Sequence, residues 1–454
     1  MLGAGIYLIV LLLMGYSTLS AIAGRQRRNL WRTAGTCAAL GAGQMGFLLL
    51  GWSLLGGTPT RGAVCVLEVM ALAATLWLWR RGRLFLPESR ADGLAAADRW
   101  VIAPTVAISG VVALVALVAI RNPVIDWDAF AIWGTKARWL LGQPLTPRPA
   151  LFSDLSLSYS HLDYPLLFPF LTAGAYAMAG GPIEQAGQFL CPFLLAALAS
   201  ILYDGIRDYL PRLPAALLVL VVLLLPQMLY FAPTGQPTLP LLVFYAASLV
   251  ALARWTNSGG REHLFLLALF SAFLALTKNE GMALAAINGA AVLGVCLFRR
   301  TRRSWLDCGL GMATFVVLLL PWTLWNWCTP RTHEDYGGRL RPAAILAHHD
   351  RLPTILAHLQ ERLLDAHSFG WFWLLLPLLA VAGYRAWHRT DVRVLWFAWL
   401  AHISLYVLVF MVTPWDLQVL LNMISARLLL HTVPAATLIA ACHWSSVRGA
   451  SGQH

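Results

Sequence analysis

Apolar runs of roughly 17–22 residues recur along the whole chain, and this is the length that a helix needs to cross a bilayer. Backbone polar groups in lipid must be satisfied internally, so these runs are predicted to be helices. The alternating strands of about ten residues that a membrane β-barrel would show are absent. The pattern therefore predicts an all-α, polytopic transmembrane helical bundle.

The predicted bundle has about 13 spans plus one short or re-entrant helix. The candidate segments are 3–23, 33–56, 62–79, 100–120, 164–180, 185–203, 213–231, 238–253, 263–277, 281–298, 305–327, 368–384, 394–412 and 427–443. The N-terminus lacks a basic segment and a clear cleavage site, so the first run is taken as a membrane helix and not as a signal peptide.

Arginine-rich segments fix the predicted orientation, because basic loops stay on the cytoplasmic side. They lie at 25–32, 80–83, 299–303 and 385–393. The chain is then expected to start outside and end inside. Five segments fall outside: 121–163, 232–237, 278–281, 328–367 and 413–426.

Two neighbouring segments conflict with this orientation. Full crossings at both 164–180 and 185–203 would invert every later loop, against the arginine pattern. We therefore expect one of the two to be short or re-entrant, and the brief link GGPIE between them suits a tight hairpin.

The outer segment 328–367 contains an amphipathic stretch. Its leucines and isoleucine share one helical face, which predicts a helix along the membrane surface: Leu352, Ile355, Leu356, Leu359 and Leu363. The histidines of this segment lack a tight ligand spacing, so an interfacial polar face is favoured over a metal site.

Composition agrees with a membrane protein: 59% of the residues are apolar and 12% are charged. The net charge of +12 comes from arginines in short loops, so it reflects topology, and no nucleic acid is expected as a partner. The seven cysteines have no CxxC spacing and are interpreted as buried apolar residues, not as a disulfide or metal framework.

The most informative polar stretch is NPVIDWDAFAIWGTKARWLL, residues 122–141, which places Asp126 and Asp128 directly after a span and Lys136 in the helix-like part that follows. Carboxylates at the mouth of a span are costly unless they are solvated or functional. They suit a general base or a cation ligand, and the alternative is an ordinary solvated loop.

The end of the same loop reads SHLDYPLLFP, residues 160–169, in which Pro165 would start the next helix. Asp163 is therefore expected to return near Asp126 and Asp128. His161, taken alone, is more often structural than catalytic.

Cations interrupt the apolar runs at two further places on the same face. Lys278 and Glu280 lie in LTKNEGMAL, either as a simple turn or as a lysine that holds a phosphate. Arg427 follows TPWDLQ near the outer boundary, where it either snorkels or binds a lipid phosphate, and we favour the phosphate. Carboxylates suit activation of a hydroxyl, and cations suit a phosphate leaving group on a membrane lipid.

Other chemistries lack support in the sequence. The chain has no Walker loop, GxSxG, HExxH or Rossmann fingerprint, and it has no nucleotide-binding domain. A nucleotide sugar bound on a soluble domain is therefore not expected as the donor.

These stretches resemble the GT-C superfamily of lipid-linked-sugar glycosyltransferases, which includes protein O-mannosyltransferases and aminoarabinose transferases. WDAFAIWGTKAR resembles the acidic first outer loop, HLDYPLLFP its return, LTKNEG the lysine-containing turn, and TPWDL with Arg427 the C-terminal portion. The likeness implies a catalytic module over 100–443, preceded by a three-span addition over 1–99 and followed by a cytoplasmic tail over 444–454.

The resemblance implies transfer of a sugar from a polyprenyl phosphate to an acceptor hydroxyl, by inversion, at the outer face of a bacterial inner membrane. Asp128 would be the general base, with Asp126 second, and Lys278 and Arg427 would hold the donor phosphate. Asp163, His161, Lys136 and Glu280 would be auxiliary. No cofactor is required, although a divalent cation remains open, and the acceptor could be a glycan, a lipid or a protein.

The chain departs from the family pattern in two places. Thr238 stands where many relatives carry an acid, which puts a second carboxylate from that loop, and any metal it would bind, in doubt. Val419 and Leu420 replace a more polar aromatic pair after TPWDL. Two alternatives therefore stay open: a transporter or flippase of lipid-linked sugar, and a catalytically inactive relative.

Overall fold

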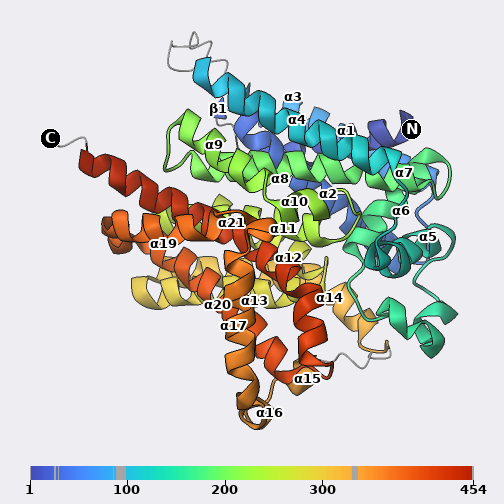
Figure 1. Ribbon diagram of the computed structural model, residues 1–454. Helices are drawn as coiled ribbons and strands as arrows, with labels where there is room; N and C mark the ends of the chain where they lie inside the picture. The colour runs from blue at the N-terminus through green and yellow to red at the C-terminus, as the bar shows by residue number, and fades with distance from the viewer. Residues whose placement is uncertain are drawn as a thin grey trace.

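Helices occupy nearly every apolar run of the sequence in the computed structural model, which describes residues 2–24, 27–28, 30–84, 86–87, 99–329 and 336–451 (Figure 1). Arg25 of the first basic segment lies outside the described residues. The predicted polytopic helical bundle is confirmed.

Ten helical segments among the described residues are long and apolar enough to cross a membrane. They are α1 (Leu2–Ala23), α2 (Leu30–Leu54), α3 (Arg61–Arg80), α4 (Arg99–Arg121), α7 with α8 (Glu184–Gln188 and Leu190–Ile206), α11 (Thr238–Ser258), α13 (Asn279–Arg299), α14 (Arg302–Asn326), α20 (Thr390–Val412) and α21 (Leu417–Ser451).

The remaining apolar segments are shorter helices: α6 (Leu167–Ala179), α9 (Arg212–Leu223), α10 (Pro226–Phe231), α12 (Arg261–Ala275) and α19 (Phe372–Ala382). The predicted single span 213–231 is divided between α9 and α10, because proline disfavours helical backbone at the residue before it and Leu225 is extended ahead of Pro226. Fewer helices than the expected 13 are therefore long enough to cross alone.

The loops carry short elements of their own. These are η1 (Asp128–Gly134), α5 (Thr135–Gly142), η2 (Ala150–Ser153), η3 (Leu155–Ser160), α15 (Tyr336–Arg339), α16 (Pro342–Ala347), η4 (His349–Arg351), α17 (Leu352–Leu364), α18 (Ala366–Phe369) and η5 (Tyr384–His388), with two short parallel strands, β1 (Arg27–Arg28) and β2 (Leu86–Pro87). The amphipathic stretch forms α17, whose Ile355 and Leu359 are buried, and α17 runs across the direction of α4 and α8 in Figure 1.

Of the two conflicting segments, the shorter is α6. Its 13 residues extend only about 20 Å, too short for a bilayer. At its entry the carbonyl of His161 accepts a hydrogen bond from Lys136, and at its exit Glu184 pairs with Arg138 at 2.5 Å. The chain on both sides of α6 therefore contacts α5, which favours α6 as the one of the two conflicting segments that is short or re-entrant.

Glycines bring α1 and α2 into close contact with the rest of the bundle. A Cβ at Gly15 would lie 1.7 Å from the carbonyl oxygen of Cys37, and one at Gly35 would lie 2.5 Å from that of Ala197 in α8. Such close backbone approach is typical of packed membrane helices. The predicted N-terminal unit therefore shares a tight interface with α8.

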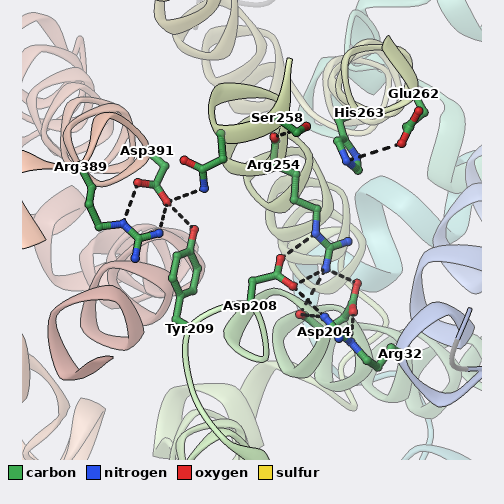
Figure 2. A network of polar contacts seen from close by, with 11 residues as sticks. Arg32, Asp204, Asp208, Tyr209, Arg254, Ser258, Glu262, His263, Arg389 and Asp391 are labelled. Atoms are coloured by element: carbon green, nitrogen blue, oxygen red, sulfur yellow. Dashed lines mark hydrogen bonds and ion pairs between the residues drawn. The ribbon is translucent and has the colours of Figure 1, made fainter. Parts of the chain in front are cut away.

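Charge networks close one end of the bundle, which we call the basic end (Figure 2). Arg32 and Arg254 each pair with both Asp204 and Asp208, at 2.6 Å for one contact and 2.7 Å for the other three. We call these four residues the basic-end network. It ties the start of α2 to the ends of α8 and α11.

A second set of contacts lies beside the basic-end network in Figure 2. The carboxylate of Asp391 pairs with Arg389 at 2.8 Å and accepts hydrogen bonds from Tyr209 at 2.9 Å and Asn257 at 2.8 Å. The predicted outer loops meet at the opposite end of the helices, which we call the site end.

Candidate functional site

The two acids of the first loop lie at the start of η1, a π-helix that covers Asp128–Gly134. The Asp126 carboxylate accepts a hydrogen bond from the backbone N–H of Ala129 at 2.9 Å and so caps this turn. π-Helices are rare and occur frequently at functional sites. The turn holds Asp126 and Asp128 at the mouth of α4, as the sequence predicts.

Gln236 joins the acidic loop to α21. Its amide nitrogen donates to Asp126 Oδ1 at 2.6 Å, and its amide oxygen accepts from Arg427 at 3.1 Å and from the Thr238 hydroxyl at 3.3 Å. An amide carries both donors and an acceptor, so it can link an anion to a cation. Gln236 is polar but cannot act as a base, and its bridging position depends on a fold that the local sequence pattern does not reveal.

Asp128 and Arg427 form an ion pair across 299 positions of the chain. The Asp128 side chain is 32% exposed and that of Arg427 is 15% exposed. Arg427 Nε is buried without a hydrogen-bond partner in the described residues. The predicted base and one predicted phosphate ligand are therefore each other's partners here, and the guanidinium retains one unused donor.

Lys278 and Glu280 lie at the start of α13 and pair at 2.7 Å. Burial lowers the pKa of Lys278, while Glu280 and Asp128 oppose that shift and Arg427 adds to it. These mutual effects place both residues within the same electrostatic cluster. We call Asp126, Asp128, Gln236, Lys278, Glu280 and Arg427 the site cluster.

Lys136 belongs to the core of the loop. The Lys136 side chain is fully buried, donates to the His161 carbonyl and lies 5.5 Å from the ring centres of both Trp133 and Tyr164. Burial lowers its pKa to about 7, and the nearby Asp163 opposes the shift. Lys136 therefore belongs to the packed interior of the loop.

The other two predicted auxiliary residues surround Lys136. Asp163 is 7% exposed, and its carbonyl accepts a hydrogen bond from Asn326 at 3.1 Å. His161 stacks on Tyr164 with ring centres 4.4 Å apart and has a left-handed backbone with φ of 50°. Both residues shape the return of the loop into α6, and Asp163 lies beside Lys136.

A pocket that is partly open to solvent lies beside η1. Phe130, Trp133 and Tyr176 line it with aromatic rings, and Arg138 with Glu184 supplies an ion pair. Gly235 also lines the cavity and directly precedes Gln236. The π-helix thus lines an aromatic cavity and, through Asp128, also contributes to the site cluster.

A metal centre made by the protein alone has no ligand set in the part of the chain that the structure describes. No three His, Cys, Asp or Glu side chains gather there in a way that could hold an ion. Asp126 and Asp128 supply carboxylates, but each is engaged by Gln236 or Arg427.

Two comparisons with known proteins match the chain. The family described as dolichyl-phosphate-mannose-protein mannosyltransferase matches residues 163–325. A crystal structure of ArnT from Cupriavidus metallidurans bound to undecaprenyl phosphate aligns with a TM-score of 0.50 and 14% identity, over 75% of this chain and 59% of that one. The chain thus spans about three fifths of that protein. No curated protein matches the sequence.

Proposed function

We propose that this chain, a polytopic membrane protein with the fold of the GT-C superfamily, is a glycosyltransferase that moves a sugar from a polyprenyl-phosphate donor to an acceptor hydroxyl. One observation carries the proposal: acids, an amide and two cations from four separate segments meet in the site cluster at the site end. Intramembrane charges of this kind are expensive unless they serve a function.

Lys278 and Arg427 are the proposed ligands of the donor phosphate. Guanidinium and ammonium groups bind phosphate oxygens through charge-assisted hydrogen bonds. The phosphodiester anion of the donor, placed near Arg427, would use its unpartnered Nε and compete with Asp128 for the guanidinium. Donor binding then converts Asp128 from an ion-pair partner into a free carboxylate.

Asp128 is the proposed general base, with Asp126 as the second choice. The acceptor oxygen attacks C1 of the sugar while the C1–O bond to the phosphate breaks and the base takes the hydroxyl proton. The lipid phosphate leaves as an anion that Lys278 and Arg427 stabilise. A single displacement of this type inverts the anomeric centre.

The cavity beside η1 is the proposed acceptor entrance. Aromatic rings suit the apolar face of a sugar or a lipid, and the Arg138–Glu184 pair suits hydroxyls. This arrangement accommodates a glycan or lipid acceptor directly and a protein acceptor through its side chain. A divalent cation, if the reaction uses one, would take oxygens from the donor phosphate in addition to Asp126 or Asp128.

The proposed location is a bacterial inner membrane, with the site end facing the periplasm. The arginine-rich helix ends gather at the basic end, and arginine-rich loops favour the cytoplasmic side. A lipid-linked sugar at the outer surface would then reach the site cluster from the membrane.

The test is donor turnover by the full chain in lipid nanodiscs. Radiolabelled undecaprenyl-phosphate sugars are supplied with a membrane extract as the acceptor source, and wild type is compared with Asp128→Asn and Asp126→Asn. Asp416→Asn is the matched control, because Asp416 is an exposed acid at the same end of the bundle.

We expect wild type and Asp416→Asn to remove label from the lipid and Asp128→Asn to retain it. Equal turnover by wild type and both site variants would leave the transferase standing and exclude these acids as bases. Donor binding without turnover of any sugar would favour the two alternatives, a transporter or flippase of lipid-linked sugar and a catalytically inactive relative.

A further inference from the structure

A chain of buried polar side chains runs through the bundle beneath the site cluster. His402 Nε2 and the Tyr406 hydroxyl lie 2.7 Å apart, and that hydroxyl lies 3.0 Å from His431 Nδ1. All three residues are at least 97% buried. They connect α20 to α21 in a region where the surrounding side chains are apolar.

Both ends of this row of side chains carry polar atoms without a hydrogen-bond partner. Within the described residues, His402 Nδ1 and His431 Nε2 are buried without a hydrogen-bond partner, and so is the hydroxyl of Tyr245, whose ring stands edge-on to His402 at 5.2 Å. Buried polar groups are normally satisfied, so each such atom requires an explanation. The site described above uses none of these residues.

The row of buried polar side chains leads toward Lys278 and Arg427, the proposed phosphate-binding cations. His431 lies one turn after Arg427 in α21, and helical side chains lean toward the N-terminus of their own helix, so the His431 ring lies on the Arg427 side. The charges of Lys278 and Arg427 act on His431. Since Nδ1 faces Tyr406, the unpartnered Nε2 is the ring atom left for the site.

Tyr406 couples the proton positions of the two histidines. Its single hydroxyl hydrogen can be donated to one ring, so it must accept from the other. When Tyr406 donates to His431 Nδ1, His431 carries its proton on Nε2 and His402 donates from Nε2. When Tyr406 donates to His402, His431 presents a bare lone pair at Nε2 and His402 carries its proton on Nδ1.

A bound anion distinguishes these two arrangements. Both contain the same number of protons, and passing to the first removes one from His402 Nδ1 and adds one to His431 Nε2. Without a bound anion, the N–H donors of the nearby ammonium and guanidinium groups favour the lone pair on His431 Nε2, whereas a phosphate there favours the N–H. Occupancy of the site therefore selects the tautomer.

We propose that His402, Tyr406 and His431 form a neutral hydrogen-bond relay through which His431 presents its Nε2–H to the phosphate group held by Lys278 and Arg427. The proposal rests on the proposed function for the presence of a phosphate at those cations. His431 is then a further phosphate ligand, and Tyr406 and His402 are positioning residues.

The first test reads the tautomer directly. Wild type with ¹⁵N-labelled histidine rings is placed in nanodiscs, and His431→Asn identifies the His431 signals by their loss. Undecaprenyl phosphate is added, its binding is followed by its ³¹P signal, and inorganic phosphate is added in a separate sample. We expect His431 to be protonated at Nε2 and its signal to shift in the sample with bound phosphate.

The outcomes separate the relay from the proposed function. A response to undecaprenyl phosphate alone supports the relay with a lipid headgroup, and a response to both supports it with phosphate from either source. Bound lipid phosphate without any change at His431 overturns the relay and leaves the proposed function intact. Failure of wild type to bind either phosphate overturns both.

The second test measures undecaprenyl phosphate affinity. A hydrogen bond to a charged group is worth about 10-fold or more in affinity, so His431→Phe is expected to weaken binding at least that much. Tyr406→Phe, which removes only the coupling hydroxyl, is expected to weaken it about 3-fold to 10-fold. His431→Gln retains an amide donor and should recover part of the loss.

A second buried histidine of α21 provides the control. His443 is fully buried, but its ring bonds to both Trp396 and the Gly383 carbonyl near the basic end. His443→Gln should leave the affinity for undecaprenyl phosphate unchanged. An equal loss of affinity in His443→Gln and His431→Phe, with intact folding, would assign His431 a general structural role and overturn the relay.

Discussion

Two clusters of arginines and acids lie at opposite ends of the same bundle, and they differ in how completely their members are paired. In the basic-end network each of two arginines meets each of two aspartates, so the four residues form a closed ring. In the site cluster Arg427 meets Asp128 and Gln236 but keeps one buried donor unused.

The helix α11 connects the two clusters, since it begins beside Gln236 and carries Arg254 near its end. The same kinds of residue therefore have two uses in one fold. A closed ring satisfies its own charges and joins helices. A cluster with spare donors is suited to a ligand that completes it, and such polar networks are costly when incomplete.

The largest expected effect is the loss of activity in Asp128→Asn. Removal of a general base lowers the rate by about 10³-fold. Stability should fall by less than in Asp204→Asn, because the Asp128 side chain is 32% exposed and Gln236 still contacts Arg427 in the variant. Donor turnover and thermal unfolding in nanodiscs measure the two quantities, and a large fall in stability with unaltered turnover would make this pair structural like the basic-end network.

For Asp204→Asn the reverse is expected, namely a loss of stability without a loss of turnover. Asp204 is 5% exposed and pairs with Arg32 and Arg254, so its replacement by an amide removes the buried one of the two acids that balance these arginines. Breaking a buried ion pair costs about 3 kcal/mol. The unfolding free energy should fall by that amount, while turnover per folded molecule stays at the wild-type level.

Asp208→Asn is the matched control for this prediction. The Asp208 side chain is 32% exposed, so its loss should cost less than the loss of Asp204. Reduced turnover per folded molecule in either variant would contradict the separation of the two clusters.

A smaller effect is expected for Gln236→Leu. The leucine cannot join Asp126 to Arg427, so both side chains lose one hydrogen bond. Loss of a bond to a charged group should lower kcat/KM about 10-fold. Gln227→Leu is the control, because Gln227 makes a long contact of 3.4 Å to Ser368, which is not part of the site cluster. Equal kcat/KM values for Gln236→Leu and Gln227→Leu would show that Gln236 has no role in the site cluster.

Helix positions and the grouping of the loops could be predicted from the sequence, because length and apolarity decide whether a segment can cross a membrane. A short helix among the two conflicting segments could also be predicted, since arginines at later loops argue against an extra crossing, and α6 has only 13 residues. These properties depend on the composition of long segments, which can be read directly from the sequence.

The contacts within the site could not be predicted in the same way. The pairing of Asp128 with Arg427 depends on how α21 is rotated relative to the loop, and neither segment encodes that angle alone. Lys136 follows the acids as if it faced solvent, yet the returning residues His161 and Asp163 cover it. The buried His402, Tyr406 and His431 lie within apolar runs, where single polar residues give no local signal.

Lys136 provides the smallest prediction and a third kind of charged site, a single cation enclosed in a loop. Its pKa is lowered to about 7 in the folded protein, so the unfolded chain binds more protons from about pH 7 up to its ordinary pKa near 10.5. Stability must therefore rise with pH across this window, by about 1 kcal/mol from pH 7 to pH 8.

Lys136→Met keeps most of the apolar stem and removes the titrating amine, so the variant should lack this part of the slope. The measurement is the difference between the unfolding free energies of wild type and Lys136→Met at pH 7 and pH 8. A constant difference would show that the amine stays charged in the loop. Lys136 would then act as a paired cation like those of the basic-end network, with Asp163 as its counter-ion.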